Sequence, residues 1–360
     1  MWPVKFLLQL RFLDLKQVLV LESLYQILNV VCEIPSGVFS DRLGRRPTLI
    51  VAASCGAASA AVFGLGSGFW AFLAANALSA VSASFQSGTD RAFHYDALEA
   101  EGREGEFQAR EAILHRDNLV VQSILCVAGG LLGIWSLRLP YAAAFACGAV
   151  ALAAAGLMKE PPPKTQVAGQ FGGALSALKA PVVAWAAAFS ALAAVLDHFP
   201  YQYYQPYLQR LSWGSSTAIA AGLHVAAAHF VGAGAVALAP RLLGRFAPRK
   251  LLLASSWIHL GMMALAAAFL HPAVAVLLAL RELPNALKNT LIAPMVLPSV
   301  GAGARATILS LIAFGSRLAV AAAIFGVSRV EGMSAQLWTA TAACAAAWLV
   351  LSGVRPRERT

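Results

Sequence analysis

Long apolar stretches separated by short polar segments recur along the whole chain. The first full stretches cover residues 17–39, 48–66, 69–88, 118–137 and 141–158, with a polar loop at 90–117. The later ones cover residues 181–201, 215–238, 251–270, 272–291, 306–327 and 335–352. About 20 apolar residues cross the hydrocarbon layer as a helix, whereas the regular alternation of a β-barrel is missing. The pattern predicts an all-α polytopic membrane protein with about 11 full helices after a short apolar segment at residues 2–12.

The composition of the chain supports the same class. Of its 360 residues, 59% are hydrophobic and only 12% are charged, and the mean hydropathy is +0.68. A soluble domain carries about 25% charged residues, so the composition excludes an ordinary soluble enzyme. The net charge of +10 lies largely in short loops between apolar stretches. That placement is the positive-inside signal of membrane proteins and argues against nucleic acid as a partner.

The distribution of Lys and Arg predicts the orientation in the membrane. One set of loops holds eighteen of these residues and the opposite set holds five, so the first set is expected on the cytoplasmic side of the inner (plasma) membrane. We therefore predict an N-terminal helical bundle at 1–158, a cytoplasmic linker at 159–180, a C-terminal bundle at 181–354 and a basic cytoplasmic tail at 355–360.

A cluster of charge lies in the short turn between the first two full stretches. Its fixed positions are Gly37, Asp41, Arg42, Gly44, Arg45 and Arg46. Gly37 permits close helix contact and Gly44 a tight turn, whereas Asp41 is placed to meet a helix N-terminus or an arginine of the other half. A weaker copy at residues 234–245 lacks the acid, which favours Asp41 as the functional element. The arginines have an alternative role as topology anchors.

This turn matches every fixed position of the pattern G-x-x-x-D-[RK]-x-G-[RK]-[RK], the hallmark loop of the major facilitator superfamily. Two further segments, Ser87-Gly88-Thr89-Asp90 and Arg305-Ala306-Thr307, resemble segments of one bacterial subgroup of that family. The resemblance covers nearly the whole chain. It implies two pseudo-symmetric six-helix bundles, a cytoplasmic latch formed by the hallmark loop, and a complete first helix, of which residues 1–12 supply about half.

The same resemblance implies a secondary active transporter that moves a small molecule by alternating access, with no catalytic residue and no cofactor. Proton coupling and efflux are the favoured expectations, in a monomer surrounded by lipid bilayer. The alternative is a non-transporting membrane sensor or scaffold, or a degenerate transporter, which an incomplete first helix would suit. No phosphate-binding loop of the form G-x-x-x-x-G-K-[ST] occurs, so ATP is not the expected driving force. An intramembrane enzyme would need a nucleophile–base set that the sequence does not show.

Polar side chains inside the apolar stretches are the candidate cavity and coupling residues, because charge at membrane depth is costly and is typical of functional sites. In the first full stretch, Glu22, Asn29 and Glu33 share one helical stripe. Glu22 is a candidate proton site, and Glu33 lies close to the charged turn in sequence. Asn76 belongs to a looser stripe in the third stretch. Polar packing between helices is the alternative interpretation for all four.

The second half of the chain carries four more candidates. Asp197 closes its apolar stretch beside His198 and several tyrosines, which suits either an interfacial anchor or a titrating outer gate. Arg281 and Glu282 lie near the middle of one stretch, and Arg317 lies near the middle of the next. Since adjacent residues do not share a helix face, we expect Glu282 to pair with Arg317 and Arg281 to face the cavity. A purely structural ion pair is the alternative.

Cysteine and histidine spacing does not predict a metal site. The five cysteines all lie in apolar stretches and none forms a CxxC pair, which is typical of small packing residues. His224 and His229 are five positions apart, and no HExxH sequence is present. We therefore expect neither a metal nor a disulfide.

Overall fold

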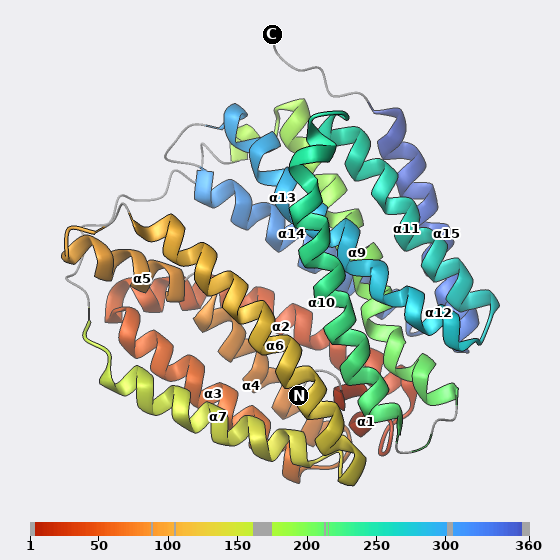
Figure 1. The fold of residues 1–360 in the computed structure, drawn as a ribbon, viewed down its shortest axis with the longest axis horizontal. Helices are drawn as coiled ribbons and strands as arrows, with labels where there is room; N and C mark the ends of the chain where they lie inside the picture. Colours follow the sequence, from red (N-terminus) through yellow and green to blue (C-terminus); the bar gives the residue numbers. More distant parts are fainter. Residues whose placement is uncertain are drawn as a thin grey trace. The chain divides into compact units, whose positions relative to one another are not determined.

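The computed structural model describes residues 4–87, 89–103, 106–160, 175–211, 214, 216–300 and 305–354. Within these ranges the chain forms helices joined by short turns, with no strand. The first series comprises α1 (Lys5–Gln9), α2 (Leu15–Leu43), α3 (Arg45–Leu65), α4 (Gly68–Gln86), α5 (Thr89–Ala100), α6 (Phe107–Trp135) and α7 (Leu139–Leu157). The second comprises α9 (Pro181–Arg210), α10 (Ser216–Leu243), α11 (Pro248–Ala268), α12 (Pro272–Leu277), η3 (Leu278–Arg281), α13 (Glu282–Val296), η4 (Leu297–Ser299), α14 (Arg305–Val327) and α15 (Met333–Gly353) (Figure 1).

Nine helices in the described part of the chain are long and apolar enough to cross a membrane. They are α2, α3, α4, α7, α9, α10, α11, α14 and α15. Helix α6 contributes a shorter apolar run, Val120–Trp135. The prediction of an all-α, multi-pass membrane protein is confirmed.

The contacts within the chain divide it into two compact units. The N-terminal unit contains Met1–Val167 and Ala218–Leu223, and the C-terminal unit contains Ala168–Thr217 and His224–Thr360. Residues 161–174 of the expected linker and the basic tail at 355–360 lie outside the described residues. The bundle boundaries at 1–158 and 181–354 therefore stay predictions.

In the N-terminal unit, α3 packs against both α4 and α7 (Figure 1). Small residues let these helices approach closely, as a Cβ at Gly148 on α7 would stand 2.9 Å from the Cβ of Ala57 on α3. Phe63 stacks on Phe72 and on Tyr141, with ring centroids 5.8 and 5.2 Å away. Close backbone approach and aromatic packing together fix these helices against one another.

In the C-terminal unit, α9 packs against α11, α13, α14 and α15. Trp185 and Phe189, stacked at 5.1 Å on α9, belong to a buried core shared with α11, α13 and α14. Trp185 Nε1 donates a hydrogen bond to the carbonyl of Leu351 at 3.1 Å. Arg249 donates to the carbonyl of Ser352 at 2.8 Å, where a cation complements the dipole of α15 at its C-terminal end.

The polar segment at 90–117, expected as a loop, is largely helical, because it contains α5 and the first turns of α6. Glu106, just before α6, accepts hydrogen bonds from Arg103 and Arg110, both at 2.9 Å. These guanidinium groups lower the pKa of Glu106 to about 2. Ion pairs between residues three or four positions apart stabilise a helix. Because these residues are polar, a search for apolar stretches does not detect the helix that they stabilise.

The apolar stretch at 272–291 is interrupted rather than continuous. Helix α12 ends at Leu277, the short 3-10 helix η3 follows, and α13 begins at Glu282. This break places Arg281 and Glu282 at a junction between two helical geometries, which decides how their side chains meet.

Candidate functional site

The charged turn joins α2 to α3 through one residue, Gly44, whose φ of +102° lies in the left-handed region. Directly after it, the backbone N–H groups of Arg45 and Arg46 donate to the two carboxylate oxygens of Glu160, at 2.6 and 2.7 Å. Glu160 lies 115 positions after Arg45, just beyond α7, and caps the N-terminus of α3. A Cβ at Gly44 would stand 2.6 Å from Glu160 Oε1. Glycine is therefore required here both for the turn and for the cap.

The arginine side chains of the turn are held inside the N-terminal unit. Arg45 Nη1 donates to Ser40 Oγ at 2.8 Å, and Arg45 Nε lies 3.5 Å from Asp96 Oδ2 on α5. Arg46 donates to the carbonyl of Gly156 near the end of α7. The turn is thus tied to α5 and to the chain around the end of α7.

Three other residues of the predicted latch are placed only in part. The side chain of Asp41 lies outside the described residues, so its partner stays a prediction. Arg42 is exposed. Within the described part of the N-terminal unit, and apart from the backbone of α2 itself, no atom lies within 4 Å of the place where a Cβ at Gly37 would stand. Gly37 is exposed on α2, and the close helix contact expected there stays a prediction.

A buried ion pair links α1 to α2. Lys5 Nζ lies 2.8 Å from Glu22 Oε2, and the Glu22 side chain is only 3% exposed. Gln26 donates to the other carboxylate oxygen at 3.2 Å, and the Lys5 ammonium lies 5.1 Å from the centre of the Tyr25 ring. Because a buried charge needs a partner, the short N-terminal helix supplies the counterion of the candidate proton site.

The other polar candidates of this unit lie on α2 and α4, which pack together. Asn29 and Asn76 are buried. Asn76 Nδ2 donates to the carbonyl of Leu21 at 3.5 Å, and Ser84 Oγ donates to the carbonyl of Asn29 at 3.0 Å. Glu33 is half-buried on α2. Hydrogen bonds from α4 side chains to the backbone of α2 are compatible with polar packing between helices and with a cavity wall. Both interpretations of these residues therefore stay open.

In the C-terminal unit, Arg281 and Glu282 pair with each other. Arg281 Nη1 lies 2.6 Å from Glu282 Oε1, and the Arg281 side chain is 2% exposed. Glu282 Oε2 accepts from Asn285 at 3.1 Å, and the guanidinium lies 5.0 Å from the Tyr201 ring centre. The expected pairing of Glu282 with Arg317 is not formed, since residues of its own segment engage both carboxylate oxygens. The break at η3 and the long arginine side chain let sequence neighbours meet.

Asp197 lies near this pair, well inside α9 rather than at its end, because α9 continues to Arg210. Asp197 Oδ1 lies 3.7 Å from His259 Nε2, which is too long for a hydrogen bond. The same His259 nitrogen lies 3.1 Å from the carbonyl of Arg281. The arrangement is an acid–histidine contact in the interior of the unit, and the expected position at the outer end of the helix is corrected.

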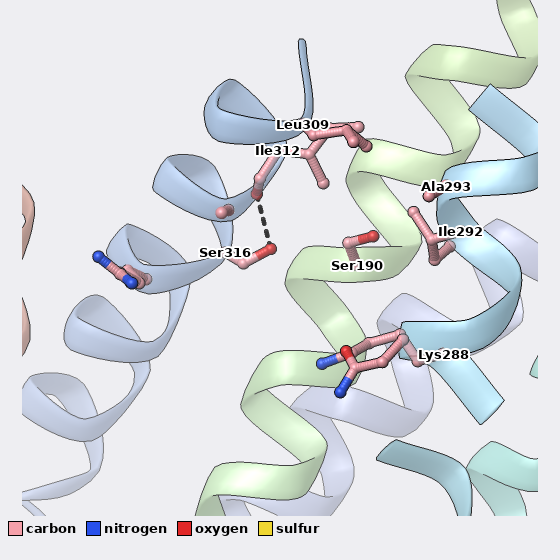
Figure 2. A pocket seen from close by; sticks show the side chains of 10 residues that line it. Ser190, Lys288, Ile292, Ala293, Leu309, Ile312 and Ser316 are labelled. Carbon is pink, nitrogen blue, oxygen red and sulfur yellow. Dashed lines mark hydrogen bonds between the residues drawn. The ribbon is translucent and has the colours of Figure 1, made fainter. Parts of the chain in front are cut away.

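A cavity of about 330 Å³ opens between α9, α13 and α14. Its polar lining consists of Ser190, Lys288, Asn289, Ser316 and Arg317, and its apolar lining of Ile292, Ala293, Leu309, Ile312 and Ala313. In Figure 2, Ser316 on α14 and Lys288 on α13 both point toward α9, which carries Ser190. Arg317 thus lines a cavity, whereas Arg281, expected there, is buried against Tyr201.

Sequence reasoning missed Lys5, Glu160 and His259. Lys5 and His259 carried a usable signal, because each is an ionisable residue inside an apolar stretch. Glu160 carried none, since its role depends on the path of the chain beyond α7. Among the described residues, no group of three or more His, Cys, Asp or Glu is placed to hold a metal ion.

The sequence matches no protein-family model and no curated protein. Solved structures do resemble it. A variant of the nucleoside transporter NupG has a TM-score of 0.79 at 14% identity, over 98% of this chain and 92% of that one. NupG itself gives 0.74 at 15% identity, over 98% and 94%. A D-xylose-proton symporter gives 0.68 at 14% identity, over 95% and 88%.

Proposed function

Because the chain has the fold of the major facilitator superfamily, we propose that it is a secondary active transporter that moves a small molecule by alternating access. The observation that carries the proposal is the presence of buried ion pairs in both units, Lys5–Glu22 and Arg281–Glu282. Charged groups are retained at membrane depth chiefly where they serve a pathway or a relay. The structures that it resembles are transporters named for a nucleoside and for xylose, which supports a small polar substrate.

Proton coupling is part of this proposal. Glu22 and Asp197 each lie beside a basic group, Lys5 at 2.8 Å and His259 at 3.7 Å. Protonation of either carboxylate would remove the attraction to its partner and so favour a different helix arrangement. A proton taken up on one side of the membrane and released on the other would then drive the substrate, with efflux as the proposed direction.

The charged turn is the proposed cytoplasmic latch. Asp41 would supply the carboxylate of the latch. Glu160 would hold the start of α3 in place, since it accepts from the backbone N–H groups of Arg45 and Arg46, directly after Gly44. In this proposal the chain is a monomer in the inner membrane, with the linker and the C-terminus in the cytoplasm and with bundles at 1–158 and 181–354.

The test is a transport screen with the purified full chain in proteoliposomes, run with and without a pH gradient. Protein-free vesicles serve as the control, and a trapped pH dye follows protons in parallel. Substrate flux that depends on the protein, and that speeds up under one sign of gradient, supports coupled transport. Binding of a compound without flux under any gradient would reject transport in favour of the sensor or scaffold alternative.

A further inference from the structure

The cavity between α9, α13 and α14 is lined by polar side chains at one end and by apolar side chains at the other. On α13 the polar lining residues, Lys288 and Asn289, come one helical turn before the apolar ones, Ile292 and Ala293. On α14 the order is reversed, and the apolar lining residues come about one turn before the polar ones. These residues are Leu309, Ile312 and Ala313, followed by Ser316 and Arg317.

The two apolar sets lie on the same side of the cavity. A short connection joins the end of α13 to the start of α14, and Ile292 and Ile312 belong to one buried core. Figure 2 shows Ile312 above Ser316 and Ile292 above Lys288. The cavity therefore has an apolar end near that connection and a polar end about one helical turn farther into the unit.

The serine side chains at the polar end can accept hydrogen bonds from a ligand. Ser316 Oγ donates to the carbonyl of Ile312 at 2.8 Å. Ser190, which lies level with Ser316 in Figure 2, donates to the carbonyl of Ala186 at 2.7 Å. A hydroxyl has one hydrogen and two lone pairs, so each hydrogen is used within its own helix while the oxygen can still accept. A ligand that binds at this end therefore needs hydrogen-bond donors.

The lysine at the polar end has acidic neighbours of its own. Lys288 interacts electrostatically with Asp197 and Glu282, so this lysine does not need a ligand to supply negative charge. Ser190 lies about 14 Å along α9 from Pro181, at 1.5 Å per residue, which places the cavity at membrane depth. Because net charge is costly at that depth, a neutral ligand suits the cavity better than an ion.

We propose that this cavity binds a small neutral amphiphile, a molecule with hydroxyl groups at one end and a hydrocarbon or aromatic part at the other. Its hydroxyl groups donate to the oxygens of Ser190 and Ser316, and its apolar part packs against Ile292 and Ile312. A volume of about 330 Å³ falls at the small end of ligand sites and suits a molecule with a single substituted ring. This inference rests on the proposed transport function, since it names the substrate class of the same protein.

Four related probes test the need for both parts of the ligand. Phenoxypropanediol carries a ring and two hydroxyl groups, propoxybenzene lacks the hydroxyl groups, glycerol lacks the ring, and phenoxyacetate carries a carboxylate in place of the diol. Each is titrated calorimetrically into the purified full chain and, as a blank, into detergent alone. The diol is expected to bind at least tenfold more tightly than each of the other three. A smaller preference, or no binding of the diol, overturns the proposal.

Variants locate the site. Ser316→Ala is expected to weaken binding of phenoxypropanediol by roughly two- to tenfold, as loss of one hydrogen bond predicts. Its unfolding midpoint without ligand should hardly change, because the hydroxyl donates only within its own helix. Ser310→Ala is the matched control, since Ser310 is exposed on the same helix and outside the lining. Unchanged affinity in Ser316→Ala, or equal weakening by Ser310→Ala, would refute the site.

A bulky substitution tests the apolar end. Ala313 is exposed and lines the cavity, so Ala313→Trp should fill the apolar end without disturbing the buried core. We expect this variant to lose binding of phenoxypropanediol while its unfolding midpoint without ligand stays close to that of the unmodified chain. Full affinity in Ala313→Trp would place the ligand elsewhere and overturn the proposal.

Proteoliposome flux separates this inference from the proposed function. Binding of the diol without flux would retain the site and reject transport. Flux of another compound, with no binding of the diol, would retain transport and reject the amphiphile site.

Discussion

Replacing Gly44 by alanine is expected to loosen the start of α3, and the structure predicts by how much. Two effects add in this variant. The φ of +102° strains any residue with a Cβ, by roughly 1–3 kcal/mol. The new Cβ would also stand 2.6 Å from Glu160 Oε1, so the carboxylate must leave the N–H groups of Arg45 and Arg46. Loss of such a helix cap costs about 0.5–2 kcal/mol.

The two effects separate in a double-mutant cycle. Glu160→Ala alone should lose only the cap, about 0.5–2 kcal/mol. Gly44→Ala in the Glu160→Ala background should add only the strain, because no carboxylate remains to be displaced. The double variant is therefore expected to lose less than the sum of the single variants, by about the value of the cap.

Thermal unfolding in detergent provides the assay. A thiol-reactive dye reports exposure of the buried residues Cys126 and Cys344, and each kcal/mol shifts the midpoint by roughly 2–4 °C in a unit of this size. Gly37→Ala is the matched control in the same motif. Gly37 is exposed on α2, so alanine should be neutral or stabilise by up to about 1 kcal/mol through helix propensity. Strict additivity of Gly44→Ala and Glu160→Ala would refute the displacement of the cap.

Three further predictions concern charge. Lys5→Met or Glu22→Gln alone should lower the free energy of unfolding by roughly 3–5 kcal/mol, and the double variant by much less. Thermal unfolding measures all three variants, and an equal loss of unfolding free energy in each would contradict the buried pair. Asp197→Asn should weaken the dependence of transport on the pH gradient, whereas Glu106→Gln should leave that dependence unchanged. The folded-state pKa of Glu106, about 2, lies below its ordinary value of 4.5, so its stabilisation is complete above that value and is lost only as pH falls toward 2. Asp41→Asn should leave the protein folded but strongly reduce transport, and full rates at normal expression would remove Asp41 from the latch.

The sequence predicted the helices well where one physical signal dominated. Long apolar stretches are expensive to expose to water and long enough to cross a bilayer, so α3, α4 and α7 fall close to the predicted ranges. The polar segment before α6 failed the same criterion, because ion pairs such as Glu106 with Arg110 stabilise it instead of an apolar face. Apolar periodicity also missed the break at η3, since Leu278, Ala279 and Leu280 continue the apolar pattern of α12.

The sequence predicted which ionisable residues belong to the candidate site, but it did not predict which residues they pair with. Glu22 was singled out because a carboxylate inside an apolar stretch is costly, and the structure buries it. Its partner, Lys5, lies 17 positions earlier on a separate short helix, and no local spacing rule connects the two. Glu160, which caps the N-terminus of α3, is still farther away in sequence, 115 positions after Arg45. Only the path of the folded chain brings the two residues together.

The pairing of Glu282 with Arg281 follows from the interruption of the helix at η3. A buried charge without a partner costs several kcal/mol, so Arg281, at 2% exposure, must take an acid within reach. A continuous helix would have turned Glu282 away from it and toward a neighbouring helix, as the sequence led us to expect. The break at η3 instead joins the two sequence neighbours at 2.6 Å, and Glu282 does not reach Arg317. The failed pairing with Arg317 is therefore a consequence of one feature, the interruption of the helix between α12 and α13. Restoring a regular helix there should turn Glu282 away from Arg281 and leave the buried guanidinium without its carboxylate partner.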